Sequence, residues 1–506
     1  MESGIVPSSV KERFSRPYGI FFAGLILLGS ILFFTGLSAP FSLGDEVHHY
    51  RFAQNCFDVK GRALYDSIYA GPAAPGFFYE TEVAWPLVLS WIWRLLGHSS
   101  FPAAQGYQTF FYALLVLGTF QTARKLYGTD HGLLSALIVA TAPMIVSFSI
   151  LFYIDMPAAA LSIWTFYLLL ERRYFLTGIV MGIAYLIKKS TGFFVPVIFC
   201  YVVADSWPQF SKIFKKGVQT FLPAGALVLI DEIWRRGNLV HGPSLAAWLL
   251  GRLASLGSGQ KNFIPLIDFT NSSILNPLDA VKYFGVSVLA GICLYFLFRC
   301  WEKKDIRLWV FTGFFFFVAF LLRLFPDIRY LMPVVPFLVI LAGKGLMQVC
   351  SFRAGKVLII GFGVLQFLSA AVYTRSQRLL PAPVLEGFTF MKENIPKESV
   401  IVYPETNLLQ YAGRRMVWSR VNLRSLFWDT EIKKVQLILI AGLDYIAVKK
   451  TRTYDDTRME FKHVGQYPVS FLRFLEHWPP AENIFENPQM LIYRINREML
   501  LRKIST

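Results

Sequence analysis

Long apolar runs dominate the first three quarters of the chain. A helix needs roughly 20 apolar residues to cross a bilayer about 30 Å thick. By this measure we predict about eleven membrane-spanning helices, near residues 18–38, 101–123, 132–149, 156–171, 174–187, 190–206, 217–233, 280–298, 308–324, 330–348 and 356–374. The pattern therefore predicts an α-helical polytopic membrane protein.

Short basic clusters separate every second pair of neighbouring runs, and the positive-inside rule assigns such clusters to the cytoplasmic side. They are Lys11/Arg13/Arg16, Arg124/Lys125, Arg172/Arg173, Lys212/Lys215/Lys216, Lys303/Lys304/Arg307 and Arg353/Lys356. We therefore predict a cytoplasmic N-terminus. We also expect nearly every carboxylate close to a span to lie on the opposite, extracytoplasmic face.

The first predicted external loop, 39–100, is long enough to contain structure of its own. Within it, residues 85–96 are apolar and rich in tryptophan, but too few to span a membrane. Aromatic side chains favour the headgroup region, so we interpret 85–96 as an interfacial helix lying along the membrane. A simple buried helix is the alternative.

After about residue 380, shorter segments replace the long apolar runs. Three of them are typical of strands and three of helices, namely 398–403, 443–448 and 490–495, and 384–394, 428–440 and 467–477. We therefore predict a transmembrane domain, 1–379, followed by a small α/β domain, 380–506. The odd number of spans places this second domain in the periplasm, where support or acceptor binding is the expected role.

The composition agrees with a membrane protein. Of the 506 residues, 55% are hydrophobic and only 16% are charged, whereas a soluble domain carries about a quarter charged residues. The net charge of +17 is divided among clusters between apolar runs, so it indicates topology and not a nucleic-acid-binding face. The five cysteines form no spaced pairs, which excludes a disulfide framework or a zinc motif.

An unusual polar stretch directly follows the first apolar run. It contains Asp45, Glu46, His48 and His49 and ends at Tyr50. Ionisable groups next to hydrocarbon usually mark a water-filled site. Helix capping by Asp45 would explain one carboxylate, but not two beside two histidines. Asp45 is therefore our candidate general base toward an acceptor hydroxyl or amine.

The same stretch raises the question of a metal ion. His48 and His49 could join Asp45 and Glu46 as ligands, but adjacent histidines point to different sides of a helix, so the spacing is a weak signature. We predict no metal site and no certain cofactor, with a divalent metal as the alternative. The expected role of the polar side chains around Asp45 is to line a substrate cavity, and this set is His48, His49, Tyr50, Glu80 and Glu82.

Further charged residues follow on the predicted external face. Asp155 opens a predicted helix, so capping is an alternative to a place in the cavity. Lys188 and Lys189 run against the positive-inside trend, which favours a bound anion over a snorkelling turn. Arg329, followed by Tyr330, begins a predicted span and opposes the helix dipole there. A phosphate partner would account for this position.

Four motifs, taken in order, resemble the membrane-embedded GT-C glycosyltransferases. Bacterial protein O-mannosyltransferase-like enzymes and the aminoarabinose transferase of lipid A are the most similar kinds. The resemblance covers about residues 1–350, and its motifs are Asp45-Glu46, Tyr153-Ile-Asp-Met-Pro157, Gly182-Ile-Ala-Tyr-Leu-Ile-Lys-Lys-Ser190 and Arg329-Tyr-Leu-Met-Pro333.

The resemblance implies both a donor and a set of roles. GT-C enzymes transfer sugars from polyprenyl or dolichyl phosphate outside the cytoplasm, with inversion of the anomeric centre. Asp45 would be the base, with Glu46 and Asp155 supporting the catalytic cavity. Lys188 or Lys189, together with Arg329 and the neighbouring Tyr330, would hold the lipid phosphate. Cations at this place stabilise the charge that develops on a phosphate leaving group.

We therefore expect an inverting hexosyl- or pentosyltransferase of the bacterial inner membrane. Its expected partners are a polyprenyl-phosphate-linked sugar, membrane lipid, and a periplasmic acceptor such as lipid A or lipopolysaccharide, another glycan or a protein. A transporter or flippase of lipid-linked saccharide is the alternative. Transporters often have inverted repeats, and the sequence has no such internal symmetry.

Overall fold

The computed structural model separates into two compact units, which we describe one at a time. The helical unit comprises Met1–Phe41 and Tyr79–Gln377, and the sheet unit comprises Ser42–Phe78 and Arg378–Thr506. The residues that the structure describes are 8–39, 46, 49–50, 53–54, 56–57, 84–237, 305–321, 332–349, 353–380, 382–396, 399–403, 430–450, 453–454 and 467–499. The predicted boundary between a transmembrane and a periplasmic domain stays a prediction.

The described part of the helical unit consists of helices. They are α1 (Ser8–Leu37), α4 (Ala84–Leu96), α5 (Phe101–Tyr127), α6 (Thr129–Thr141), α7 (Pro143–Ile150), α8 (Asp155–Leu170), α9 (Tyr174–Ile187), the 3-10 helix η1 (Lys189–Phe194), α10 (Val195–Ala204), α11 (Phe210–Gly237), α14 (Ile306–Leu321), α15 (Val335–Val349) and α16 (Arg353–Arg378). The predicted runs coincide with these helices, except 280–298, which lies outside the described residues.

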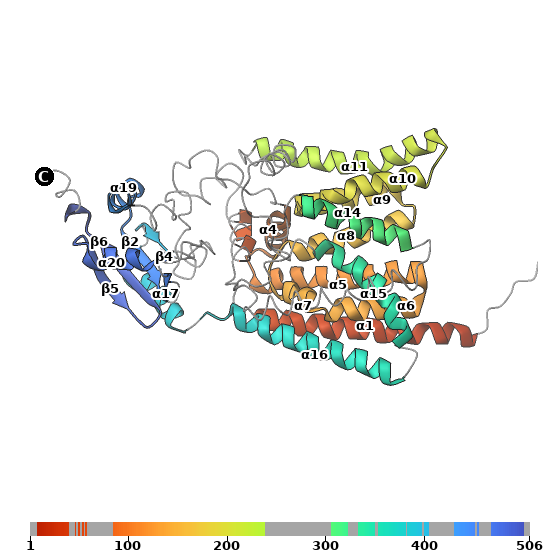
Figure 1. Ribbon diagram of the computed structural model, residues 1–506, viewed down its shortest axis with the longest axis horizontal. Coiled ribbons are helices and arrows are strands. Elements are labelled where there is room, and N and C mark those ends of the chain that lie inside the picture. Colours follow the sequence, from red (N-terminus) through yellow and green to blue (C-terminus); the bar gives the residue numbers. More distant parts are fainter. Residues whose placement is uncertain are drawn as a thin grey trace, which may run out of the picture. The chain divides into compact units, whose positions relative to one another are not determined.

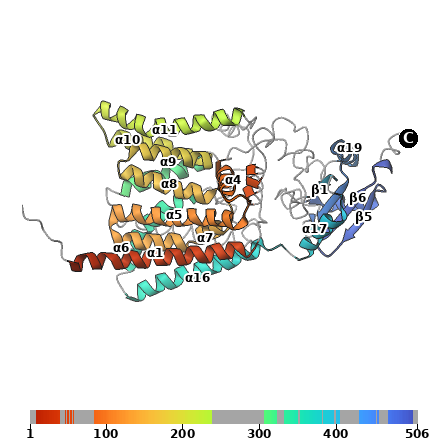
Figure 2. The ribbon, with the colours of Figure 1, turned by 180° about the vertical axis from the view of Figure 1, so that it is seen from behind.

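The helices of this unit form an antiparallel bundle with two distinct ends (Figure 1). Short connections reverse the chain after α5, α8 and α10, and these three helices end on the same side. We call that side the basic end, because Arg124, Lys125, Arg172 and Lys216 lie there. At the opposite end, α4 leads into α5, α8 begins and α9 finishes (Figure 2).

Not every apolar helix is long enough to cross a membrane alone. Among the described residues, three segments pass by length and composition, namely Gly19–Leu37, Phe210–Ile233 and Gly355–Ser376. The α6–α7 pair adds a fourth if its 57° bend lies within one span. Pro143 causes this break, since it forces Ala142 into an extended conformation with ψ 126°. The predicted number of spans and their orientation stay predictions.

Two glycines allow α9 to lie directly against α11. Gly178 and Gly182 are four residues apart on one face of α9, the small-residue spacing that brings membrane helices together. A Cβ at Gly178 would collide with the Thr220 carbonyl, and one at Gly182 would lie 3.0 Å from the Ala224 Cα. This contact fixes α9, whose C-terminal end leads directly to Lys188.

The short helix α4 confirms the predicted helix over 85–96. Trp85, Leu89 and Trp93 are buried on one face. The Trp85 ring stacks on Tyr107 of α5 with ring centroids 3.8 Å apart, and Trp93 Nε1 donates a hydrogen bond of 2.9 Å to the Ser100 carbonyl. Leu95 on the other face is 88% exposed. The place of α4 along the membrane stays a prediction.

The sheet unit contains a four-stranded sheet in the order β1-β2-β6-β5. Its strands are β1 (Ile401–Val402), β2 (Tyr445–Lys449), β5 (Ala481–Glu486) and β6 (Met490–Ile495), and its helices are α17 (Ala382–Asn394), α19 (Glu431–Ala441) and α20 (Val469–His477). β1 and β2 are parallel, and the other neighbours are antiparallel. Two further short strands, β3 (Thr453–Tyr454) and β4 (Tyr467–Pro468), pair in parallel.

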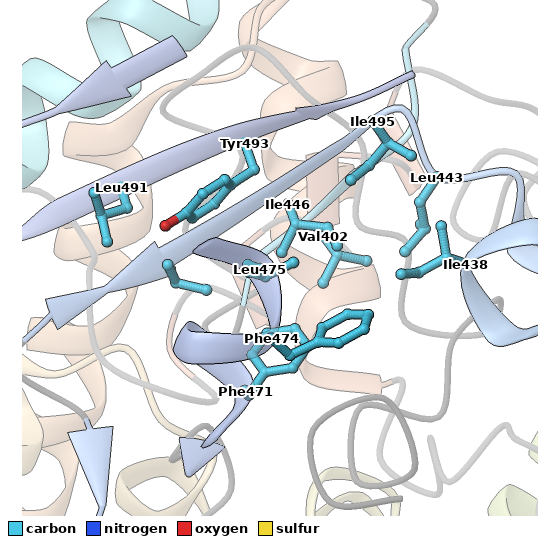
Figure 3. Close-up of a cluster of buried hydrophobic side chains, with 11 residues drawn as sticks. Val402, Ile438, Leu443, Ile446, Phe471, Phe474, Leu475, Leu491, Tyr493 and Ile495 are labelled. Atoms are coloured by element: carbon cyan, nitrogen blue, oxygen red, sulfur yellow. The ribbon is translucent and has the colours of Figure 1, made fainter. Parts of the chain in front are cut away.

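The predicted strands and helices of this region are confirmed, but the sequence did not predict β3, β4 or β5, and β4 takes the first two residues of the predicted helix 467–477. Strand β6 is central to the sheet and is buried on both faces. Leu491 and Tyr493 point from β6 toward α20 and join a core that includes Phe471 and Leu475 (Figure 3). On the other face, Met490 packs against Gly387 of α17.

Candidate active site in the helical unit

The structure brings together two of the predicted site residues, Asp155 and Lys188. Lys188 Nζ donates a hydrogen bond to Asp155 Oδ1, although the two residues are 33 positions apart in the chain. Their side chains are 3% and 1% exposed, respectively. The pair lies at the opposite end of the bundle, where α8 begins and α9 finishes. It is a buried ion pair between two helix ends.

Asp155 is held at the start of α8 without acting as its cap. The N-cap residue is Ile154, and no side-chain cap hydrogen bond forms there. A carboxylate in the first helical turn is still favoured by the helix dipole. The segment that connects α7 to α8 is held by Gln108 of α5. Its Nε2 donates hydrogen bonds to the carbonyls of Leu151 at 2.8 Å and Tyr153 at 3.1 Å. Gln108 thus sets where α8 begins.

Lys188 occupies a break between two helices. Its backbone is extended, with φ −147° and ψ 112°, between α9 and η1. The Lys188 carbonyl accepts hydrogen bonds from Thr191 through its backbone nitrogen at 3.0 Å and its Oγ1 at 2.9 Å. Irregular backbone within a membrane protein is tolerated where it is buried in protein or lines a cavity. The break therefore aims the Lys188 side chain at Asp155.

The two adjacent lysines differ in their surroundings. Lys188 is buried and paired with Asp155, whereas Lys189 is half-buried. A buried charge is strongly disfavoured unless a partner of opposite charge and hydrogen bonds compensate it. Asp155 compensates Lys188 in this way. Anion binding by the two lysines stays a prediction.

Glu46 has a partner that the sequence did not predict. Its Oε1 accepts hydrogen bonds from Arg378 Nε at 2.9 Å and from Arg378 Nη2. Both residues belong to the sheet unit and both side chains are fully buried. An arginine at the end of a long apolar helix is a weak signal, because such residues usually lie in the headgroup region. The contact holds the Glu46 side chain in place.

The other predicted site residues divide into two groups. His49 and Tyr50 are half-buried residues of the sheet unit. The rest lie outside the described residues, and they are Asp45, His48, Glu80, Glu82, Arg329 and Tyr330. Their roles stay predictions.

One carboxylate oxygen of Glu46 is already engaged, which bears on the alternative of a divalent metal. A metal ligand at this position needs a carboxylate oxygen free to coordinate. Glu46 Oε1 already accepts from the Arg378 guanidinium, and a second cation at this oxygen would be repelled. Among the described residues, no three His, Cys, Asp or Glu side chains are grouped closely enough to hold a metal ion.

The basic end contains carboxylates that we expected on the other face. Asp205 accepts hydrogen bonds from Arg172 at 3.1 Å, Tyr174 at 2.5 Å and Lys216 at 2.7 Å. Asp305 binds Lys344 in the same way at 2.7 Å. Glu171 likewise pairs with Lys125 at 2.9 Å. The expectation was wrong because carboxylates also neutralise the basic clusters themselves.

Part of the chain matches a known enzyme family. Residues 83–234 match the family model of dolichyl-phosphate-mannose-protein mannosyltransferases. This segment contains both Asp155 and Lys188. No curated protein matches the chain.

Solved structures similar to this one include two structures of one protein. ArnT from Cupriavidus metallidurans in the apo state has a TM-score of 0.61 at 13% identity, over 96% of this chain and 99% of ArnT. ArnT bound to undecaprenyl phosphate gives 0.59 at 13% identity, over 94% and 97%.

The archaeal oligosaccharyltransferase AglB from Archaeoglobus fulgidus, in complex with an inhibitory peptide and a dolichol-phosphate, gives a TM-score of 0.54 at 11% identity. The match covers 85% of this chain and 69% of AglB. At sequence identities this low, the structural similarity shows a shared fold and does not determine the substrates of this protein. The order of the helices, the small C-terminal sheet and these likenesses identify the chain as a membrane protein with the fold of the GT-C glycosyltransferases.

Proposed function

We propose that this protein is an inverting glycosyltransferase that moves a sugar from a polyprenyl phosphate to an extracytoplasmic acceptor. The observation that carries the proposal is the buried Asp155–Lys188 pair beside Lys189, within the segment matched by a mannosyltransferase family model. The lipid phosphates bound to ArnT and AglB support a donor of this class. The acceptor is lipid A or lipopolysaccharide, another glycan or a protein.

In this proposal the lysines stabilise the leaving group. Negative charge develops on the lipid phosphate as its bond to the sugar breaks, and cations fixed in advance stabilise that charge without reorganising. Asp155 holds the Lys188 ammonium in place in a buried position. Asp155 is therefore a positioning residue. Lys189 is the second lysine that binds the donor phosphate, with Arg329 and Tyr330 as further ligands.

Asp45 acts as the general base. It accepts the proton of the acceptor hydroxyl or amine, whose oxygen or nitrogen attacks the anomeric carbon from the face opposite the phosphate. The bond between that carbon and the phosphate oxygen breaks, and polyprenyl phosphate leaves with the electron pair. A single displacement inverts the anomeric centre and needs no covalent sugar–enzyme intermediate. Glu46, whose side chain is held by Arg378, supports the catalytic cavity in this proposal.

The remaining predicted residues complete the substrate cavity in this proposal, and they are His48, His49, Tyr50, Glu80 and Glu82. The proposed location is a bacterial inner membrane, with the N-terminus in the cytoplasm and the sheet unit in the periplasm. The basic clusters support this orientation through the positive-inside rule. Labelling of single cysteines introduced near residue 10 and near residue 480 from the two sides of intact vesicles tests it.

The decisive experiment compares the wild type with Asp45→Asn in detergent. Purified protein is incubated with polyprenyl-phosphate-linked sugars and an envelope extract, and the products are separated by mass spectrometry. We expect Asp45→Asn to remain folded and to bind donor without transferring sugar, because an amide is not a base. Wild-type turnover in this variant would refute the assignment. Transfer in detergent also separates an enzyme from a flippase, which needs two compartments to show its activity.

The matched control is Asp205→Asn, which makes the same chemical change at the basic end. Asp205 is bound by Arg172, Tyr174 and Lys216 and has no part in the proposed reaction. We expect this variant to transfer sugar at the wild-type rate once equal amounts of folded protein are compared. A loss in both variants would show that the assay responds to stability and not to the base.

A further inference from the structure

The sheet unit contains a pocket that none of the proposed catalytic or donor-binding residues lines. Its volume is about 490 Å³, within the range of roughly 300–1,000 Å³ that is usual for small-molecule sites. It lies between α20 and the last two strands of the sheet. Its lining is formed by Lys450, Leu472, Leu475, Glu476, Ala481, Asn483, Glu486, Leu491 and Tyr493.

A β-bulge in the edge strand brings two polar side chains to this pocket. Asn483 pairs with Tyr493, and Glu486 pairs with Leu491, with a register shift between Asn483 and Phe485. In a regular strand, residues three positions apart point to opposite faces. The extra residue reverses this relation, so Asn483 and Glu486 both face the pocket. Bulges of this kind often re-aim side chains next to functional sites.

The polar side chains of the lining form a connected group. Lys450 Nζ donates a hydrogen bond to Glu486 Oε1, and Asn483 Nδ2 donates to Glu486 Oε2 at 3.2 Å. The Lys450 ammonium lowers the pKa of the Glu486 carboxyl from its ordinary value. Glu486 is therefore ionised at neutral pH and is oriented by two neighbours. Its remaining lone pairs are acceptors toward the pocket.

Two further polar groups are present without a partner in the described part of the chain. Neither the Tyr493 hydroxyl nor the Glu476 carboxylate makes a hydrogen bond or ion pair with a described residue. Burial, with smaller contributions from Glu476 and Glu486, raises the pKa of Tyr493 to about 12. The hydroxyl therefore keeps its proton at neutral pH. The Glu476 side chain is exposed, so a ligand that hydrogen-bonds to both groups would take the place of water there.

The mixture of groups restricts the chemistry of that ligand. Two carboxylates against one ammonium disfavour a phosphate or another anion, so the pocket is unsuited to the lipid-phosphate donor. A purely apolar ligand would leave the ammonium, amide, hydroxyl and carboxylates unpaired, which is costly. A neutral compound with many hydroxyl groups uses donors and acceptors together, and its C–H faces can contact Leu472, Leu475 and Leu491.

We propose that the pocket formed by α20, β5 and β6 binds a neutral saccharide unit. Tyr493, Glu476, Asn483 and Glu486 hydrogen-bond to its hydroxyl groups, and the leucine side chains contact its ring. As a recognition site for an acceptor glycan, the pocket rests on the proposed function. Saccharide binding itself does not depend on it, because the pocket belongs to the sheet unit alone.

Saturation-transfer NMR on the full-length protein tests the proposal. The protein is placed in lipid nanodiscs, because detergents with sugar headgroups would compete. The probes are the methyl glycosides of glucose, galactose, mannose and N-acetylglucosamine, with glucose 6-phosphate and tetralysine for comparison. We expect saturation of the ring protons of at least one neutral glycoside. We also expect no binding of the sugar phosphate, because the carboxylates repel it.

Three variants locate the binding. Tyr493→Phe keeps the ring in the core and removes only the hydroxyl, and Glu476→Gln keeps the shape and removes the charge. Each is expected to weaken glycoside binding about tenfold, the usual effect of losing one good hydrogen bond. The matched control is Glu482→Gln on the same strand. Glu482 pairs with Arg494, one position along from Asn483, so this variant is expected to bind like the wild type.

Three outcomes would overturn the proposal: no neutral glycoside binds, the three variants bind alike, or tetralysine binds in place of the sugars. The transfer assay is scored separately. If wild type binds glycoside but transfers no sugar, the proposed function fails and the saccharide site stands. If transfer occurs and Tyr493→Phe and Glu476→Gln leave the KM for a glycan acceptor unchanged, acceptor recognition fails while the transferase assignment stands.

Discussion

The two ends of the helical bundle use the same kinds of side chain in different surroundings. At the basic end, Asp205 has three cationic or hydroxyl partners, of which the Arg172 side chain is 70% exposed. At the opposite end, Asp155 and Lys188 are almost fully buried, and a second lysine follows directly in the chain. Charge pairing is common to both ends, but the Asp155–Lys188 pair is the more deeply buried one. At the basic end the side chains of Lys344 and Asp305 are still 15% and 4% exposed.

In our proposal this difference in burial separates a structural pairing from a functional one. At the basic end the carboxylates neutralise clusters that the sequence already assigns to one side of the membrane. Exposed pairs of this type contribute little to stability. A buried pair requires the desolvation of two charges, and such an arrangement inside a membrane protein indicates a site by default. Burial, and not charge, therefore distinguishes the two ends.

The largest effect is expected when the buried pair is broken. Lys188→Met leaves Asp155 as an uncompensated buried charge, so we expect a loss of about 3–5 kcal/mol in the free energy of unfolding together with loss of transfer. Thermal unfolding in detergent and the transfer assay measure the two effects. The double variant Asp155→Leu/Lys188→Met restores most of the stability, since apolar residues replace both charges. Transfer by this double variant would contradict the role of the lysine.

The second largest effect is expected from a substitution in α9, the helix that leads from the basic end to Lys188. Gly178→Ala introduces a Cβ that collides with the Thr220 carbonyl, so α9 has to move away from α11. We expect a loss of roughly 1–3 kcal/mol in stability and slower transfer, because Lys188 follows the end of α9. Gly225→Ala is the matched control, since no atom lies within 4 Å of a Cβ built there. Equal effects of the two substitutions would argue against the close packing of α9 and α11.

A smaller effect is expected from the cluster at the basic end. Asp205→Asn removes a carboxylate with three hydrogen-bond partners, and we expect a loss of about 1–2 kcal/mol in the free energy of unfolding. The rate of transfer per folded molecule should not change. Thermal unfolding compared with the turnover number measures both. A large loss of turnover with unchanged stability would place catalytic function at this end as well.

The smallest effect is expected from the most exposed pair. The Lys125 side chain is 50% exposed and lies 2.9 Å from Glu171. Lys125→Gln should therefore change stability by less than about 1 kcal/mol and leave transfer unchanged. The comparison is made at low and high salt, because an exposed pair is screened by ions. A stability loss as large as that of Lys188→Met would remove the distinction between the two ends.

Much of the fold was predictable because local patterns determine it. Apolar runs of helical length coincide with helices over the described residues, and alternating segments after residue 380 coincide with β1, β2 and β6. β5 was missed for a local reason. Its bulge between Asn483 and Phe485 interrupts the alternation by which a strand is recognised.

Among the candidate site residues, the sequence identified Asp155 and Lys188 separately, through helix starts and the positive-inside trend. It left open which of the two lysines is the central one, because adjacent residues share the same local pattern. It also gave no indication of Arg378 as the partner of Glu46, since 332 positions separate them. Such pairs form when segments distant in the chain pack together, and the local pattern of apolar and polar residues does not predict them.

The sequence by itself determined the helical class, the basic clusters, the small C-terminal sheet and the order of motifs typical of a GT-C fold. These follow from hydropathy, turn residues and short spacings, which act over a few residues. Only the tertiary structure decided that Lys188 is buried against Asp155, that carboxylates neutralise the basic end, and that a bulge brings Asn483 and Glu486 to one pocket. These features depend on burial, which exists only once distant segments have packed.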